Sequence, residues 1–291
     1  RKPLGSGGES FYRAAMTSPR PAISSRFAFP AMLVGSASMA FGPWMVRIAD
    51  VGPIASGFWR LALATPVLFL LVRLGGESIR VSGRLLWPLA AAGLLFAADL
   101  AAWHLAILRT TLANAVLFVN SASISFAAYG FIIARRLPRP PVALAMGLAI
   151  VGIGLLIGRS VDLSPRHLAG DLLALAAAGF YTFYLIVVGR ARSDGLGALP
   201  LLALASAAGA AGLLPAALLV EGRIMPGLWW PLVALALSSQ VFGQGLIVYA
   251  VGHLEPVVVG LCLLVQPVIA AAIGWTLFGE RWAVMFTDLI G

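Results

Sequence analysis

The chain has 291 residues, of which 60% are hydrophobic and only 11% are charged, and its mean hydropathy is +0.97. A soluble domain carries roughly a quarter charged residues, so the composition excludes an ordinary soluble domain and predicts an integral membrane protein. The net charge of +9 comes from basic residues scattered singly between apolar runs, without the basic stripe that nucleic-acid binding needs, and no nucleic-acid partner is expected.

The N-terminal segment, residues 1–26, is polar, basic and rich in Gly, Ser and Pro. It predicts a disordered tail in which Met16 is a candidate natural start behind a leader, leaving the native status of residues 1–15 open. The first apolar run lies far from the start and has the length of a membrane span, so no cleavable signal peptide is expected.

Apolar runs then follow one another along the chain. A spanning helix needs about 20 mostly apolar residues, and this criterion predicts spans near 27–47, 54–73, 87–107, 112–133, 142–158, 170–189, 199–220, 229–250 and 256–277. A tenth begins near residue 284, and we expect the chain to lack most of it. Between the fifth and sixth spans the sequence predicts a polar break.

The orientation follows from the 20 lysines and arginines. About twice as many lie in the N-terminal tail and the breaks after even-numbered spans as in the breaks after odd-numbered ones, and this excess marks the cytoplasmic side. We therefore expect a multi-pass protein of the cell (inner) membrane whose N- and C-termini are both cytoplasmic.

The two halves of the chain are similar to each other. A shift of 144 residues aligns residues 106–130 with 250–274 and residues 135–147 with 279–291. Each half is predicted to be a five-helix unit, at 27–158 and 170–291, and an odd number of spans makes the second unit enter the membrane from the opposite side. The expected fold is an all-α polytopic membrane protein with ten transmembrane helices in two inverted five-helix repeats, the tenth truncated. Chance similarity between helices rich in Leu, Ala and Gly is the alternative.

Several segments carry a family resemblance. They are the second span, FWRLALATPVLFLLV, with its early Arg60, the small-residue start of each fourth span, the fifth span, MGLAIVGIGLLIG, and QPVIAAAIGWTLFGERW from Gln266 onward. Over residues 28–291 the pattern resembles the drug/metabolite transporter superfamily in its ten-helix EamA-type branch. Its most distinctive part runs from Pro267 to Gly279–Glu280, and the first half departs from it with Ser123 and Arg135–Arg136.

Polar side chains at membrane depth are costly and usually face a cavity or a partner. Gln240 and Gln244 stand four apart and share a helix face, where hydrogen bonding between helices is the alternative to lining a cavity. Asp99 is the one carboxylate near the middle of a predicted span: a proton-coupling site, a counter-charge for an ammonium group, or a partner of Arg60 or His104. The candidates for lining a substrate cavity are Trp44, Asp99, Trp103, Asn120, Tyr181, Tyr184, Gln240, Gln244 and Gln266.

Three other features have structural interpretations. Arg60 lies only six residues inside its span, so we expect it to extend to the surface or to pair with a helix end. Pro43 and Pro267 are expected to bend their helices for gating, and Pro267 frees the carbonyl of Leu263. The fifth span carries Gly147 and the pair Gly154 and Gly158, which predict a close-packing surface.

These patterns favour a secondary transporter over other functions. The chain has no GxxxxGK[ST] phosphate loop for ATP and no HExxH motif or aspartate pair for an intramembrane enzyme, and it has no filter loop that would indicate a channel. With three histidines and one cysteine, Cys262, neither a metal site nor another cofactor is expected.

The substrate is the next question. Aromatic rings and amides suit an amphipathic organic solute, and the resemblance extends to the YddG-type exporters, which implies export of aromatic and other neutral amino acids by alternating access. Another metabolite or drug class, such as a sugar derivative or nucleoside, is the alternative. Besides substrate and lipid bilayer no partner is expected, and the internal duplication predicts that a monomer can transport.

Overall fold

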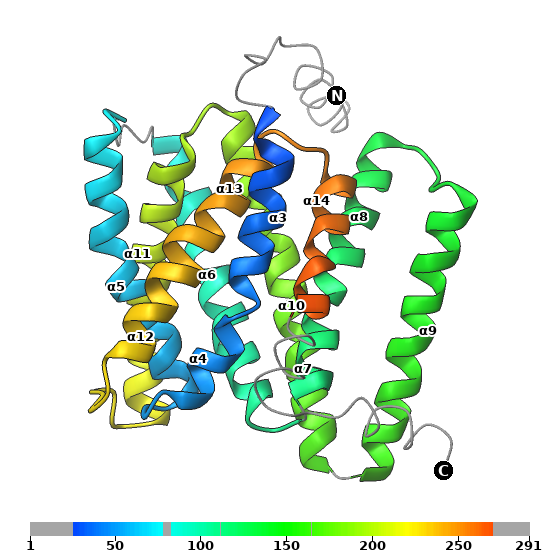
Figure 1. The fold of residues 1–291 in the computed structure, drawn as a ribbon, viewed down its shortest axis with the longest axis horizontal. Coiled ribbons are helices and arrows are strands. Elements are labelled where there is room, and N and C mark those ends of the chain that lie inside the picture. Colours follow the sequence, from blue (N-terminus) through cyan, green and yellow to red (C-terminus); the bar gives the residue numbers. More distant parts are fainter. Residues whose placement is uncertain (1–25, 78–82, 111, 164, 270–291) are drawn as a thin grey trace, which may run out of the picture.

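The computed structural model describes residues 26–77, 83–110, 112–163 and 165–269, and these form a bundle of helices (Figure 1). The first half of the chain contains α3 (Ala28–Met39), α4 (Gly42–Ile48), α5 (Pro53–Leu74), α6 (Gly83–Ile107), α7 (Leu112–Val119), α8 (Ser121–Ala134) and α9 (Pro140–Leu163). The second half contains α10 (Pro165–Ser193), α11 (Ala198–Val220), α12 (Trp230–Ala234), the π-helix η1 (Leu235–Gln244), α13 (Gly245–Val251) and α14 (Pro256–Leu263).

Within these residues, seven helical stretches are long and apolar enough to cross a membrane, which makes this a multi-pass membrane protein. They coincide with the first four predicted spans and with the sixth, seventh and eighth. The fifth and ninth predicted spans fall on shorter apolar helices over residues 140–155 and 256–269. The predicted N-terminal tail up to residue 25 and the tenth span lie outside the described residues.

Two helices extend beyond the predicted fifth and sixth spans. Helix α9 continues to Leu163 and α10 begins at Pro165, so the polar residues between these spans are largely helical. Proline is favoured at the first position of a helix, because its fixed φ suits the helix and its missing N–H would have no partner there. Pro53, Pro140 and Pro256 begin α5, α9 and α14 in the same way.

The halves pack against each other through small residues. Helix α10 packs on α6, α11 packs on α5 and α6, and α14 packs on α8. A β-carbon on Gly93 of α6 would come within 2.8 Å of the Ala205 carbonyl oxygen of α11, and one on Gly260 of α14 within 2.5 Å of the Ser123 carbonyl oxygen of α8. Such close backbone approach is typical of helix contacts in membranes.

The predicted close-packing surface of the fifth span is not seen among the described residues. Helix α9 lies at the edge of the bundle (Figure 1), and β-carbons placed on Gly147, Gly154 and Gly158 would have none of the described atoms within 4 Å. A glycine spacing permits close approach but does not require it, because the neighbour must also be present.

Helix boundaries recur with the offset seen in the sequence. Helix α6 ends at Ile107 and α13 at Val251, 144 residues later, and α7 (Leu112–Val119) has the same offset to α14 (Pro256–Leu263). In Figure 1, α3 begins at the top of the view whereas α10 begins at the bottom.

Two carboxylates join the halves at one end of the bundle, where α4 and α12 lie (Figure 1). Glu221, at the end of α11, accepts hydrogen bonds from the backbone N–H groups of Ile54 (2.7 Å) and Ala55 (2.9 Å) in the first turn of α5. Asp50 accepts bonds from the N–H groups of Gly227 (2.7 Å) and Leu228 (3.0 Å) before α12. A carboxylate at a helix N-terminus accepts hydrogen bonds from backbone N–H groups that have no partner within the helix, and its negative charge complements the helix dipole.

The opposite end holds related groups. Glu77 and Asp194 stand 144 residues from Glu221 and Asp50 in the sequence. The Glu77 carboxylate lies against Gly197, the residue before α11, as the Glu221 carboxylate lies against Gly52 before α5.

Candidate functional site

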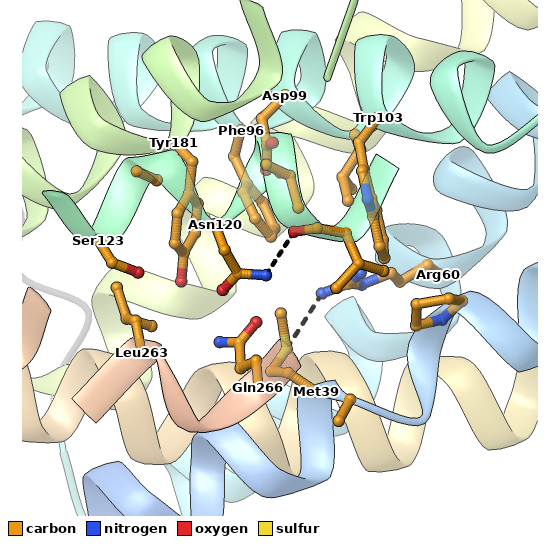
Figure 2. A pocket seen from close by; sticks show the side chains of 16 residues that line it. Met39, Arg60, Phe96, Asp99, Trp103, Asn120, Ser123, Tyr181, Leu263 and Gln266 are labelled. Atoms are coloured by element: carbon orange, nitrogen blue, oxygen red, sulfur yellow. Dashed lines mark hydrogen bonds between the residues drawn. The ribbon is translucent and has the colours of Figure 1, made fainter. Parts of the chain in front are cut away.

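A cavity of about 60 Å³ lies in the middle of the bundle (Figure 2). Its lining comes from α3, α4, α5, α6, α7, α8, α10 and the end of α14, so both halves of the chain contribute. Of the predicted residues, Pro43, Asp99, Trp103, Asn120, Tyr181 and Gln266 line it. Trp44, Tyr184, Gln240, Gln244 and Pro267 lie outside its lining, and Met39, Arg60, Phe96 and Ser123 are lining residues that the sequence did not predict as such.

Arg60 does not extend to the surface as predicted: its side chain is 0% exposed and lines the cavity. Its Nε donates to Gln240 Oε1 (3.1 Å), its Nη2 donates to Met39 Sδ (3.6 Å), and the guanidinium carbon lies 5.7 Å from the centre of the Phe96 ring. Helix α5 packs between α6, α11 and η1, so a side chain on its inner face has no path along lipid to water. The cavity therefore contains a buried cation.

Gln240 positions the Arg60 side chain through a hydrogen bond. While its Oε1 accepts from Arg60, its Nε2 donates to Ser206 Oγ on α11 at 3.0 Å. Both ends of this buried amide are thus bonded to the protein, which corresponds to the interhelical hydrogen bonding considered as the alternative to cavity lining.

Gln244 plays a similar part for two tyrosines. Tyr181 Oη donates to Gln244 Oε1 (3.4 Å), and Gln244 Nε2 donates to Tyr184 Oη (3.2 Å). The Phe96 and Tyr184 rings stack with centroids 4.7 Å apart, and Tyr181 and Tyr184 stack at 5.7 Å. Gln244 and Tyr184 therefore fix the position of the Tyr181 ring, which faces the cavity.

Both glutamines belong to η1, a π-helix of ten residues. π-Helices are rare and are frequent at functional sites. This wider helix directs Gln240 and Gln244 inward from one element, which the spacing of four residues predicted, although the sequence did not indicate the π geometry.

Asp99 lines the cavity from α6 and is 6% exposed. Within the described part of the chain its carboxylate makes no hydrogen bond, and no cation lies within the 4.0 Å of an ion pair. His104 is not its partner, because the His104 ring nitrogen Nδ1 lies 2.8 Å from the Pro53 carbonyl oxygen and 2.9 Å from Ser56 Oγ. Of the roles considered for Asp99, direct pairing with Arg60 or His104 does not occur here.

Other polar atoms at the cavity also lack partners. Trp103 Nε1 and Ser123 Oγ are buried without a hydrogen bond to any described residue. Asn120 Nδ2 donates to the Val116 carbonyl in its own helix (2.7 Å), and the side chains of Asn120 and Gln266 both point into the cavity (Figure 2). Trp44, by contrast, packs edge-on against Trp230 with centroids 6.5 Å apart.

Helix interruptions surround the cavity. Helices α7 and α8 meet at Asn120, and α14 ends before a turn at Leu264, after which residues 265–269 are helical again. Asn120 and Leu264 are 144 residues apart, so the interruptions also follow the offset. Pro267 lies three residues after the turn and has no N–H to give to the Leu263 carbonyl. On the first span, α3 and α4 are separated at Ala40–Phe41, just before Pro43.

The sequence contained a signal for two of the lining residues that it did not predict. Phe96 is the position that the 144-residue offset pairs with Gln240, and Ser123 is the position paired with Pro267. For Arg60, the cost of a charge inside a span was itself the signal. Among the described residues no cluster of three or more His, Cys, Asp or Glu could hold a metal ion.

Comparisons with known proteins agree with this architecture. Residues 168–287 match the model of the EamA-like transporter family. A solved structure, titled only "Crystal structure of protein", superimposes with a TM-score of 0.66 over 90% of this chain and 91% of its own, at 18% identity, and so shares the fold. The comparison with curated proteins gave no match. Residues 168–287 are less than half of the chain, and over this part the chain is similar to a family of transporters.

Proposed function

We propose that the protein is a secondary transporter of the inner membrane that exports small amphipathic metabolites, foremost aromatic and other neutral amino acids. The observation that carries this proposal is the central cavity, which combines a buried cation, a carboxylate and aromatic rings from several helices. Polar groups at membrane depth mark substrate pathways. The EamA family match supports transport, and the aromatic lining supports an amphipathic substrate.

The proposed mechanism is alternating access between two inverted five-helix repeats. The recurring helix boundaries support the repeat, as do the paired interruptions at Asn120 and Leu264. Substrate sites of such transporters lie near the bilayer midplane at the interface of the repeats. Sites for drug-sized ligands enclose about 300–1,000 Å³, far more than the ≈ 60 Å³ found here, so substrate entry requires the surrounding helices to move apart. The proposed unit is a monomer with both termini cytoplasmic.

Counterflow in proteoliposomes tests the function. Purified protein is reconstituted, the vesicles are loaded with unlabelled phenylalanine, leucine, a sugar or a nucleoside, and uptake of the same labelled compound is followed. We expect amino acids on the inside to accelerate uptake, because a carrier that releases labelled substrate inside can bind unlabelled substrate there and return to the outward-facing state with it. If only a sugar or a nucleoside inside the vesicles accelerates uptake, the substrate belongs to that class and not to the amino acids. Uptake that does not depend on the compound inside the vesicles would indicate a channel. Product formation without flux would indicate an enzyme.

A further inference from the structure

Arg60 is a buried cation, and none of the described groups that it contacts directly carries an opposite charge. Its hydrogen-bond partners are an amide oxygen and a thioether sulfur, and Phe96 offers a ring face. Nη1 is buried with no hydrogen bond to any described residue. A guanidinium has five N–H donors and matches carboxylates in paired geometry. Breaking a buried charge pair leaves an expensive lone charge, so a site that presents this group is suited to an anionic ligand.

Asp99 presents the opposite charge to the same cavity. It lies on α6, whereas Arg60 lies on α5, and the two are farther apart than the 4.0 Å of an ion pair. Figure 2 shows Asp99 beside Phe96 on one wall and the Arg60 side chain reaching in from another direction. Two opposite charges that face one cavity without forming a direct ion pair can each take a separate group of one ligand.

We propose that Arg60 and Asp99 are the specificity-determining pair for a zwitterion, with Arg60 binding the α-carboxylate and Asp99 the α-ammonium group of an amino acid. The Phe96, Trp103 and Tyr181 rings line the same cavity and receive the apolar side chain. Trp103 Nε1 and Ser123 Oγ, which make no hydrogen bond within the described part of the chain, supply further hydrogen bonds. This inference rests on the proposed transport of amino acids and assigns the chemistry that selects them.

The pair predicts discrimination by charge. A ligand that lacks one of its two charged groups leaves the matching protein charge desolvated and unpaired, and a site built for polar partners rejects such analogues strongly. Phenethylamine lacks the carboxylate of phenylalanine, and 3-phenylpropionate lacks its ammonium group. Neither should compete well with phenylalanine in the wild-type protein.

Competition against labelled phenylalanine in counterflow, run with Asp99→Asn, Arg60→Gln and Arg60→Lys, tests the assignment. A hydrogen bond to a charged group contributes about 1.5–3 kcal/mol, so each neutralised variant should bind phenylalanine about tenfold or more weakly. Asp99→Asn should lose its discrimination against 3-phenylpropionate, and Arg60→Gln its discrimination against phenethylamine. Arg60→Lys keeps the charge and should continue to reject phenethylamine. Glu255→Gln, which removes an exposed carboxylate, is the matched control.

The outcomes separate this inference from the proposed function. Exchange of amino acids with equal competition by both analogues, or variants that weaken all three ligands equally, would overturn the zwitterion assignment and leave amino-acid transport standing. Exchange of sugars or nucleosides in place of amino acids would overturn both. If Arg60→Gln does not fold, the wild-type analogue pattern together with Asp99→Asn and Arg60→Lys decides the question.

Discussion

At the scale of single residues, polar groups of the cavity divide into those that face it and those that support it. Trp103 faces it, and its Nε1 has no hydrogen bond to a described residue. Gln244 lies behind it and bonds Tyr181 and Tyr184. The two substitutions to alanine should therefore have different consequences.

We expect Trp103→Ala to reduce transport while the detergent-extracted protein stays monodisperse; the loss of a buried ring lowers its melting temperature, but no hydrogen bond to a described residue is lost. Gln244→Ala should reduce transport and also lower stability by about 1 kcal/mol, because two buried hydroxyls lose a partner. Counterflow and thermal unfolding measure the two effects. Trp87→Ala is the matched control, since Trp87 lies on the same helix as Trp103 and is 83% exposed. Unfolding of both cavity variants would contradict the division.

The sequence could predict such residues only in part. Asp99, Trp103 and Asn120 were found because polar or aromatic groups inside apolar spans need a partner. Arg60 was misplaced because whether an arginine reaches water depends on which helices surround its own. That information lies in the contacts of α5 with α6, α11 and η1, not in its position along the span.

At the scale of elements, two helices can pack closely where a glycine of one helix faces the backbone of the other. Gly260→Ala should destabilise the protein, because its β-carbon would come within 2.5 Å of the Ser123 carbonyl oxygen and 3.1 Å of the Ala127 β-carbon. Thermal unfolding in detergent measures the loss. Gly179→Ala on α10 is the control, since none of the described atoms lies within 4 Å of its added carbon. Equal melting temperatures for the two variants would show that α14 and α8 can separate without cost.

The spans themselves were predictable, because length and apolar composition decide membrane crossing. The interruptions were less so. Pro267 indicated a bend, and the structure interrupts the helix at Leu264, one turn earlier, because the effect of a proline falls on the carbonyl four residues before it. The ten-residue π-helix has no comparable marker in the sequence.

At the scale of the whole molecule, the predicted orientation can be tested with single cysteines in a Cys262→Ala background, since Cys262 is the one native cysteine. Leu137→Cys and Asp194→Cys should react with a membrane-impermeant maleimide only after permeabilisation. Leu108→Cys and Met225→Cys, exposed at the other end, should react in intact cells. The reverse pattern would invert the orientation, and a mixed result within either pair would contradict the topology.

The carboxylates at the helix ends bear on the energy of the transport cycle. Asp50 and Glu221 accept four backbone hydrogen bonds at one end, and separating that end would break these bonds. Glu77 and Asp194 stand at the offset positions of the other end. On the alternating-access proposal, the carboxylate contacts of the two ends are related by the offset, so that opening either end forfeits a similar set of interactions. The two conformations then stay close in free energy, and a weakly bound substrate, with little differential affinity, suffices to shift the population between them.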